Sequence, residues 1–173
     1  MRVINNKVLF KGKIFSVFGT VLKDKNGNKF LRETVVHPGA VAIIPLIPPN
    51  KVILVRQYRY PTGKYLWELP AGTIDKNESS YSCARRELQE ETGFSAGKMR
   101  KIIEFYTCPG FCTEKMYLYV AEKLKFMAQK LDADEKVEYK TFSRNNVKHL
   151  IKKNRIIDAK SLIGLILWLQ KKI

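Results

Sequence analysis

Acidic residues gather at two places in a chain that is otherwise rich in cations. The 173 residues include 32 Lys and Arg against 16 Asp and Glu, which gives a formal net charge of +16. Six of the 16 acidic residues lie between Glu68 and Glu91, and four more lie between Asp132 and Glu138. Solvation of a surface does not require such clustering, but a bound cation does. Clustered carboxylates suit a hard divalent ion that takes oxygen ligands, above all Mg²⁺.

Three glutamates of the first cluster share one face of a helix predicted over residues 79–92. At about 100° per residue, Glu87, Glu90 and Glu91 occupy an arc about 100° wide beside an apolar stripe. The members of that stripe are Tyr81, Ala84 and Leu88. Like charges at these spacings repel, and burial adds a desolvation cost. The alternative is an ordinary solvated helix face, on which arginines pair with the glutamates. Arg86 can reach Glu90, four residues later, but this pair would compensate one carboxylate at best.

The loop before this helix completes a longer pattern. From Gly72 the sequence reads Gly, five residues, Glu78, seven residues, Arg86-Glu87-Leu88, one residue, Glu90-Glu91, one residue, Gly93-Phe94. This resembles the Nudix hydrolase box at every fixed position. The resemblance implies an α/β fold, a Nudix-type α/β/α sandwich with a mixed sheet, in which the box forms a loop–helix–loop. It also implies hydrolysis of a nucleoside diphosphate linked to a second group, with Mg²⁺ or Mn²⁺ as cofactor.

The resemblance assigns roles to residues of the box. The implied metal ligands are the carboxylates of Glu87, Glu90 and Glu91 and the backbone carbonyl of Ala71. Glu90 is a ligand or lies close to one, and it is also a catalytic candidate. Arg86 and Glu78 resemble the pair that orients the metal-binding carboxylates, which agrees with the role of outer residues in metal sites.

Segments outside the box are similar to the ADP-ribose pyrophosphatase subgroup. Pro109, sixteen residues after Gly93, matches the position that marks this subgroup. The other similar segments are Arg56-Gln57-Tyr58-Arg59, residues 67–72 and residues 37–41. The implied reaction is hydrolysis of ADP-ribose to AMP and ribose 5-phosphate. The alternatives are another nucleoside diphosphate derivative (a nucleotide sugar, a dinucleoside polyphosphate or FAD) and a non-catalytic nucleotide- or RNA-binding domain.

Three arginines are candidates for substrate binding. Arg59 and Arg56 match positions that contact substrate phosphate or ribose, and a guanidinium suits phosphate oxygens. Arg56 has a structural alternative, in which it pairs with Glu68 or lines the sheet edge. Arg32 resembles a position that reaches substrate from the N-terminal hairpin.

Two further glutamates are candidates for proton transfer or substrate contact. Glu135 lies in the second acidic cluster and matches the catalytic carboxylate of ADP-ribose hydrolases, as general base or as a residue that orients water. Glu114, which follows Pro109, is the second candidate. The alternative for the cluster around Glu135 is a solvated turn.

The elements that position these residues follow from periodicity and turn signals. Residues 14–22 and 30–36 are β-rich and flank Asn26-Gly27, a hairpin signal. We expect a small antiparallel N-terminal β element at residues 1–38 and a Nudix domain at residues 39–173. Ser143 and Asp158 are predicted to cap two later helices, and Gly93 to end the first. Further strands are predicted at 40–47, 52–58, 102–107, 116–121 and 137–142.

Composition narrows the class of protein and its partners. The sequence has neither the apolar core of a signal peptide nor an apolar run long enough to cross a bilayer, so we expect a cytoplasmic protein without a membrane partner. Lysines are dispersed, with no arginine-rich block, so specific nucleic-acid binding is not expected. The three cysteines form no disulfide framework and are expected to be buried. The N-terminal hairpin resembles a dimerisation element, which predicts a homodimer.

Overall fold

The computed structural model describes residues 1–129 and 136–173, and these divide into two compact units. The first unit comprises residues 1–39 and 105–116, and the second comprises residues 40–104 and 117–173. Each unit is described below by itself. Along the described residues, no helix combines the length and apolar character that crossing a membrane requires.

The first unit contains a three-stranded antiparallel sheet in the order β1-β2-β3. Its strands are β1 (Arg2–Lys11), β2 (Ser16–Lys23) and β3 (Lys29–Val36). At the β2–β3 turn, the Asp24 carboxylate accepts hydrogen bonds from the backbone N–H groups of Asn26 and Asn28, both at 2.8 Å. Gly27 adopts a left-handed φ of 90°, which favours glycine. The N-terminal hairpin predicted around Asn26-Gly27 is therefore confirmed.

The second unit is built on a seven-stranded sheet with the path β10-β5-β4-β9-β8, to which β6 adds beside β5 and β7 beside β4. The strands are β4 (Ala40–Ile47), β5 (Lys51–Arg59), β6 (Lys64–Glu68), β7 (Ala71–Thr73), β8 (Phe94–Tyr106), β9 (Lys115–Phe126) and β10 (Val137–Ser143). The helices are η1 (Tyr60–Thr62), α1 (Ser80–Thr92), α2 (Arg144–Lys152) and α3 (Ala159–Leu169). The last two residues of β8 and the first two residues of β9 belong to the first unit.

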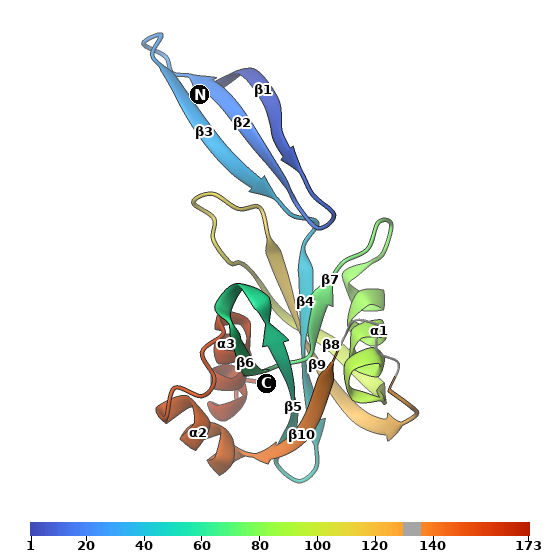
Figure 1. The fold of residues 1–173 in the computed structure, drawn as a ribbon. Coiled ribbons are helices and arrows are strands. Elements are labelled where there is room, and N and C mark those ends of the chain that lie inside the picture. The colour runs from blue at the N-terminus through green and yellow to red at the C-terminus, as the bar shows by residue number, and fades with distance from the viewer. Residues whose placement is uncertain (130–135) are drawn as a thin grey trace. The chain divides into compact units, whose positions relative to one another are not determined.

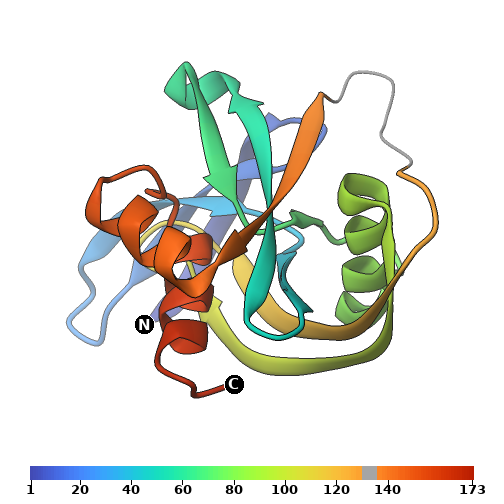
Figure 2. The same ribbon diagram turned by 90° about the horizontal axis from the view of Figure 1, so that it is seen from below.

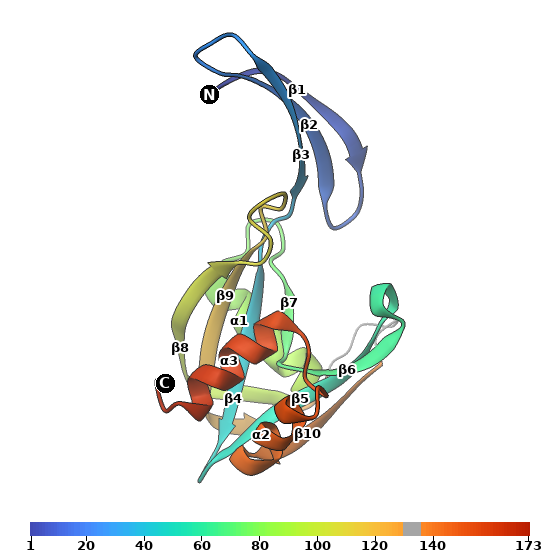
Figure 3. The ribbon, with the colours of Figure 1, turned by 90° about the vertical axis from the view of Figure 1, so that its left-hand side faces the viewer.

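Helices cover both faces of the sheet in the second unit. Figure 1 shows α1 on one side of β4 and β7, with α3 and α2 on the other side. Figure 2 shows the same separation from below, and Figure 3 shows α3 lying across β4. The sheet is mixed, so the predicted α/β fold with helices on both faces is confirmed.

Strand β4 explains why the second unit has two apolar layers. Its residues from Ala40 to Pro45 are all buried, as expected for a strand covered on both faces. Val41 and Ile43 belong to the core cluster that also contains Cys83 and Leu88 of α1. The side chain of Ile44 instead lies beside Gly164 of α3. Helices α1 and α3 are thus fixed on opposite sides of one strand.

The helix ends predicted at Ser143, Asp158 and Gly93 are confirmed, but two details of the predicted packing are wrong. Ser79, Ser143 and Asp158 each accept a backbone hydrogen bond from the residue three positions later, and Gly93 ends α1 with a left-handed φ of 76°. Tyr81 was expected in the buried stripe of α1 but is 45% exposed, because it lies in the first turn at the helix edge. Of the three cysteines predicted to be buried, only Cys83 is buried, whereas Cys108 is exposed and Cys112 is partly exposed.

Candidate active site

The loop before α1 is held by its pairing with β4. Residues Ala71–Thr73 form the short strand β7, which runs antiparallel to the start of β4. The helix then begins after Ser79, whose hydroxyl accepts a hydrogen bond from the Ser82 backbone N–H at 3.1 Å. Strand, turn and helix therefore form the loop–helix–loop that the sequence pattern predicted.

Glu91 connects α1 to the loop before it through a hydrogen bond. Its carboxylate accepts a hydrogen bond from the Ala71 backbone N–H at 3.0 Å, and the residue is 3% exposed. Gln129 also donates to the backbone carbonyls of Glu91 and Val137, at 2.7 and 3.2 Å. The end of α1 is thereby joined to both the loop and the start of β10.

Gly72 is required by the position of Glu87. A Cβ atom added at Gly72 would overlap the Glu87 carboxylate, so no larger residue fits there unless this side chain moves. Glu87 is also 12% exposed. The second residue of β7 and the middle of α1 therefore approach each other closely, with carboxylate oxygens directly over the loop backbone.

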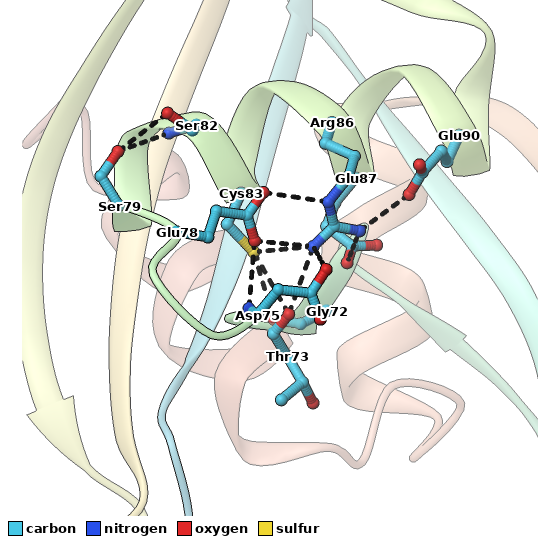
Figure 4. Close-up of polar contacts among 10 residues, drawn as sticks. All are labelled: Gly72, Thr73, Asp75, Glu78, Ser79, Ser82, Cys83, Arg86, Glu87 and Glu90. Carbon is cyan, nitrogen blue, oxygen red and sulfur yellow. Dashed lines mark hydrogen bonds and ion pairs between the residues drawn. The ribbon is translucent and has the colours of Figure 1, made fainter. Parts of the chain in front are cut away.

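Arg86 lies at the centre of the charged cluster (Figure 4). Its Nε and Nη2 atoms donate to the two oxygens of Glu78, both at 3.0 Å. Its Nη1 atom donates to Glu87 at 2.7 Å and to Glu90 at 2.9 Å. The prediction that Arg86 compensates one carboxylate at best is wrong, because the planar guanidinium fork reaches three.

These contacts shift the ionisation of the cluster. The hydrogen bond from Arg86 lowers the pKa of Glu78, against a smaller effect of burial. The same bond, together with the contacts of Glu87 and Glu90, raises the pKa of the Arg86 guanidinium. Burial raises the pKa of the neighbouring Cys83 thiol, which keeps this thiol protonated. Arg86 and Glu78 are therefore both charged at neutral pH.

Carboxylates outnumber cations around Arg86. The members of this cluster, the Arg86 network, are Arg86, Asp75, Glu78, Glu87 and Glu90. One guanidinium faces four carboxylates, and Glu91 lies on the same helix. Oxygen donors of this type fit Mg²⁺. Within residues 1–129 and 136–173, no three acidic, cysteine or histidine side chains stand close enough together to hold a metal ion.

The predicted substrate-binding arginines of the second unit are found in different settings. Arg59 donates to both oxygens of Glu68, from Nε at 2.9 Å and from Nη2 at 2.8 Å. Arg56 pairs with Glu138 at 2.7 Å, so the alternative that paired Arg56 with Glu68 is wrong. The Arg56 guanidinium also lies over the Tyr65 ring, 4.6 Å from its centre.

The other predicted residues lie outside the described part of the second unit. Arg32 and Glu114 belong to the first unit, where Arg32 donates to the Leu31 carbonyl at 3.0 Å and Glu114 accepts from Thr107 at 2.7 Å. His37 lies 3.8 Å from Glu114. Glu135 lies outside the described residues, so its role stays a prediction.

A buried charged group on β6 and α3 was not identified from the sequence. Glu68 is 1% exposed and contacts the ammonium of Lys160, which also pairs with Asp158 at 2.8 Å. Burial would raise the pKa of Glu68, but the hydrogen bond from Arg59 and the charge of Lys160 lower it below its usual value. The sequence had indicated Glu68 as a possible ion-pair partner and Asp158 as a helix cap, but nothing pointed to Lys160.

The loop–helix–loop with its excess of carboxylates is the part of the molecule best suited to a cation-assisted reaction at a phosphate. A family model described as the NUDIX domain matches residues 36–163. The chain belongs to the Nudix family, and its fold and similarity to pyrophosphatases identify it as a hydrolase.

Individual relatives extend this similarity along nearly the whole chain. An ADP-ribose pyrophosphatase of Bacillus subtilis (strain 168) is 37% identical, over 99% of this chain and 93% of the relative. A methanol dehydrogenase activator of Bacillus methanolicus is 39% identical, over 94% of this chain and 89% of the relative. A crystal structure of an ADP compounds hydrolase has a TM-score of 0.86 at 26% identity, over 99% of this chain and 95% of that one.

Proposed function

We propose that this Nudix hydrolase cleaves the diphosphate of ADP-ribose to AMP and ribose 5-phosphate with Mg²⁺, for which Mn²⁺ can substitute. The observation that carries the proposal is the excess of carboxylates around Arg86, on the helix that Glu91 ties to the Ala71 backbone. The similarity to an ADP-ribose pyrophosphatase and to an ADP compounds hydrolase supports the choice of substrate.

In this proposal the ion would be held by oxygen atoms of the loop–helix–loop. The ligands are Glu87, Glu90, Glu91 and the carbonyl of Ala71. Bound there, Mg²⁺ would supply charge neutralisation for the diphosphate oxygens and a lowered pKa for the attacking water. Arg86 would give up its Nη1 contacts with Glu87 and Glu90 while keeping Glu78 on its other edge. Glu78 and Arg86 would therefore act as the pair that positions the helix carboxylates.

The remaining roles follow the chemistry of the reaction. Water attacks one phosphorus, the bridging P–O bond breaks, and a base takes the proton of the water. We assign that role to Glu135, with Glu114 as the second candidate. Arg59 and Arg56 would bind phosphate or ribose, and Arg32 would contact substrate from the N-terminal hairpin. Glu135→Gln should then lower kcat more than it raises KM, whereas an unchanged kcat would move the base to Glu114.

The substrate is tested by a hydrolysis panel. Purified protein with Mg²⁺ is incubated with ADP-ribose, GDP-mannose, diadenosine polyphosphates and FAD, and the products are identified. The proposal requires AMP and ribose 5-phosphate, with the highest kcat/KM for ADP-ribose. Preferred cleavage of another compound would select that substrate. Steep salt-dependent RNA retention without cleavage of any compound would instead support a binding domain.

The same proposal includes a cytoplasmic homodimer formed through the N-terminal β element, residues 1–38. Along the three-stranded sheet, all of which the structure describes, no hydrophobic side chain is buried within one copy, and β1 is exposed along its whole length. Val8, Phe10 and Leu31 are each about half exposed. A small sheet with uncovered apolar side chains is marginal in water. Light scattering should give a dimer mass, and Phe10→Glu should give a monomer; a monomeric wild type would exclude this assembly.

A further inference from the structure

The first turn of α3 contacts the segment that leads into the catalytic loop. The Leu69 backbone N–H donates to the Ser161 hydroxyl at 2.7 Å, across 92 positions of sequence. One turn later, a Cβ atom added at Gly164 would lie 2.7 Å from the Leu69 side chain, so the helix approaches Leu69 closely. Leu69 is two residues before Ala71. The contacts of α3 with Leu69 thus help to fix the position of the loop that begins at Ala71.

The residue before Leu69 is held by charge from the same helix turn. Glu68 is almost fully buried, and both of its oxygens accept hydrogen bonds from Arg59. Lys160 contacts one of these oxygens and also Asp158, the residue that caps α3. This group of four charges, the Glu68 network, comprises Arg59, Glu68, Asp158 and Lys160. It contains two cations and two carboxylates, so its members compensate one another.

The contacts of Arg59 leave one edge of its guanidinium available. Nε and Nη2 are used by Glu68, whereas Nη1 has no hydrogen bond to any residue in the described part of the chain. The side chain is 36% exposed. Its pKa is raised chiefly by the hydrogen bonds to Glu68, and the charge of Glu91 at the end of α1 adds a smaller contribution. The free edge has the geometry and charge to bind a phosphate oxygen.

We infer that Lys160 is a positioning residue of the active site: through Glu68 it fixes the Arg59 guanidinium with Nη1 available for substrate phosphate. The inference rests on the proposed function, in which Arg59 binds the diphosphate. Arg59 binds both oxygens of the buried Glu68 carboxylate, and Lys160 contacts one of the same oxygens. Lys160 supplies the second cation from a helix that Ser161 fixes to the loop. Arg59 is thereby held in one orientation before substrate arrives, which lowers the entropic cost of binding.

The test is a comparison of lysine variants by kinetics. Lys160→Met keeps the apolar stem of the side chain and removes its charge, whereas Lys160→Arg keeps the charge. Lys148→Met, on the exposed face of α2, is the matched control. We expect kcat/KM for ADP-ribose to fall about 10–100-fold in Lys160→Met, mainly through KM, and to recover in part in Lys160→Arg. Lys148→Met should equal the wild type.

A double-mutant cycle separates positioning from a general loss of stability. If Lys160 acts through Arg59, Lys160→Met should have little further effect on kcat/KM in an Arg59→Ala background. Rates are normalised to the folded fraction measured by circular dichroism. Wild-type kcat/KM in Lys160→Met, or an equal loss with and without Arg59, would overturn the inference.

A binding measurement distinguishes failure of this inference from failure of the proposed function. If the wild type cleaves no compound of the panel, the proposed reaction is wrong. Binding of ADP, a diphosphate probe, is then measured by isothermal titration. The inference then requires that Lys160→Met weakens ADP binding about 10-fold and that this effect disappears with Arg59→Ala. Equal ADP affinity in wild type and Lys160→Met would overturn it.

Discussion

Two charged clusters adjoin the short segment from Glu68 to Thr73, and they differ in charge balance. The Arg86 network places four carboxylates around one guanidinium, whereas the Glu68 network pairs two carboxylates with two cations. They also differ in the burial of the central group, since the side chain of Glu68 is 2% exposed and that of Arg86 is 30% exposed. One cluster is compensated around a buried carboxylate, and the other has excess negative charge around a partly exposed guanidinium.

The difference indicates what each cluster contributes. A buried carboxylate must be compensated within the chain, because an unpaired charge in the interior costs several kcal/mol. Carboxylates around a partly exposed guanidinium can keep an excess of negative charge, and a cation from solution then gains by binding there. The Glu68 network therefore serves as a frame, and the Arg86 network as the proposed site of the ion. The following predictions test this division of roles.

The largest expected effect is on turnover when a carboxylate of α1, the proposed metal-binding helix, loses its charge. Glu90→Gln and Glu91→Gln should each lower kcat about 10²–10³-fold, because stabilisation of charge in the transition state is lost. The amide oxygen introduced by Glu91→Gln can still accept the Ala71 N–H, so folding should be retained. Glu104→Gln, which weakens an exposed contact with Lys101, is the control. Near-wild-type rates in both variants would refute the metal assignment.

The Glu68 network should show the opposite pattern, with a loss of stability. Glu68→Gln removes the buried charge that compensates Arg59 and Lys160, and breaking a buried pair costs about 3–5 kcal/mol. Because Arg59 is partly exposed to water, we expect the lower end of this range. Urea unfolding of wild type and variant measures the difference. A loss below about 1 kcal/mol, the range of exposed pairs, would show that this network is not a frame.

Magnesium should stabilise the protein through the Arg86 network. An ion that binds only the folded state adds about 2.7 kcal/mol at a concentration of 100 times its Kd. Thermal unfolding with increasing Mg²⁺ should therefore show a rising Tm in wild type and a much smaller rise in Glu90→Gln. Glu68→Gln should keep the full Mg²⁺ effect at its lower starting Tm. A Tm that does not respond to Mg²⁺ or Mn²⁺ in wild type would contradict an ion site in this cluster.

These two clusters were not equally predictable from the sequence. The Arg86 network could be found because Glu78, Arg86, Glu87 and Glu90 lie within 13 residues, and a single helix with its preceding loop fixes their spacing. Apolar periodicity from residue 79 and the glycine at position 93 gave the limits of that helix. Local sequence was sufficient here because local geometry places these side chains.

The Glu68 network could not be found in this way. Glu68 and Lys160 are 92 positions apart, and their contact depends on how α3 crosses the sheet. Alternation along β5 places Arg56 and Arg59 on opposite faces, but the choice of partner for Glu68 depends on the pairing register of β5, β6 and β10. Strand β7 has only three residues and was likewise missed, because its hydrogen bonds come from β4.

The smallest expected effect concerns Arg56, whose pair with Glu138 provides an exposed counterpart to both clusters. Both side chains are more than 40% exposed, so Arg56→Met should change the unfolding free energy by less than about 1 kcal/mol. If Arg56 binds substrate as proposed, KM for ADP-ribose should nevertheless rise several-fold while kcat stays near its wild-type value. Glu138→Gln, which breaks the same pair but keeps the guanidinium, is the matched control. An equal rise of KM in both variants would show that the pair acts by orienting Arg56, whereas unchanged KM in both would remove Arg56 from the binding site.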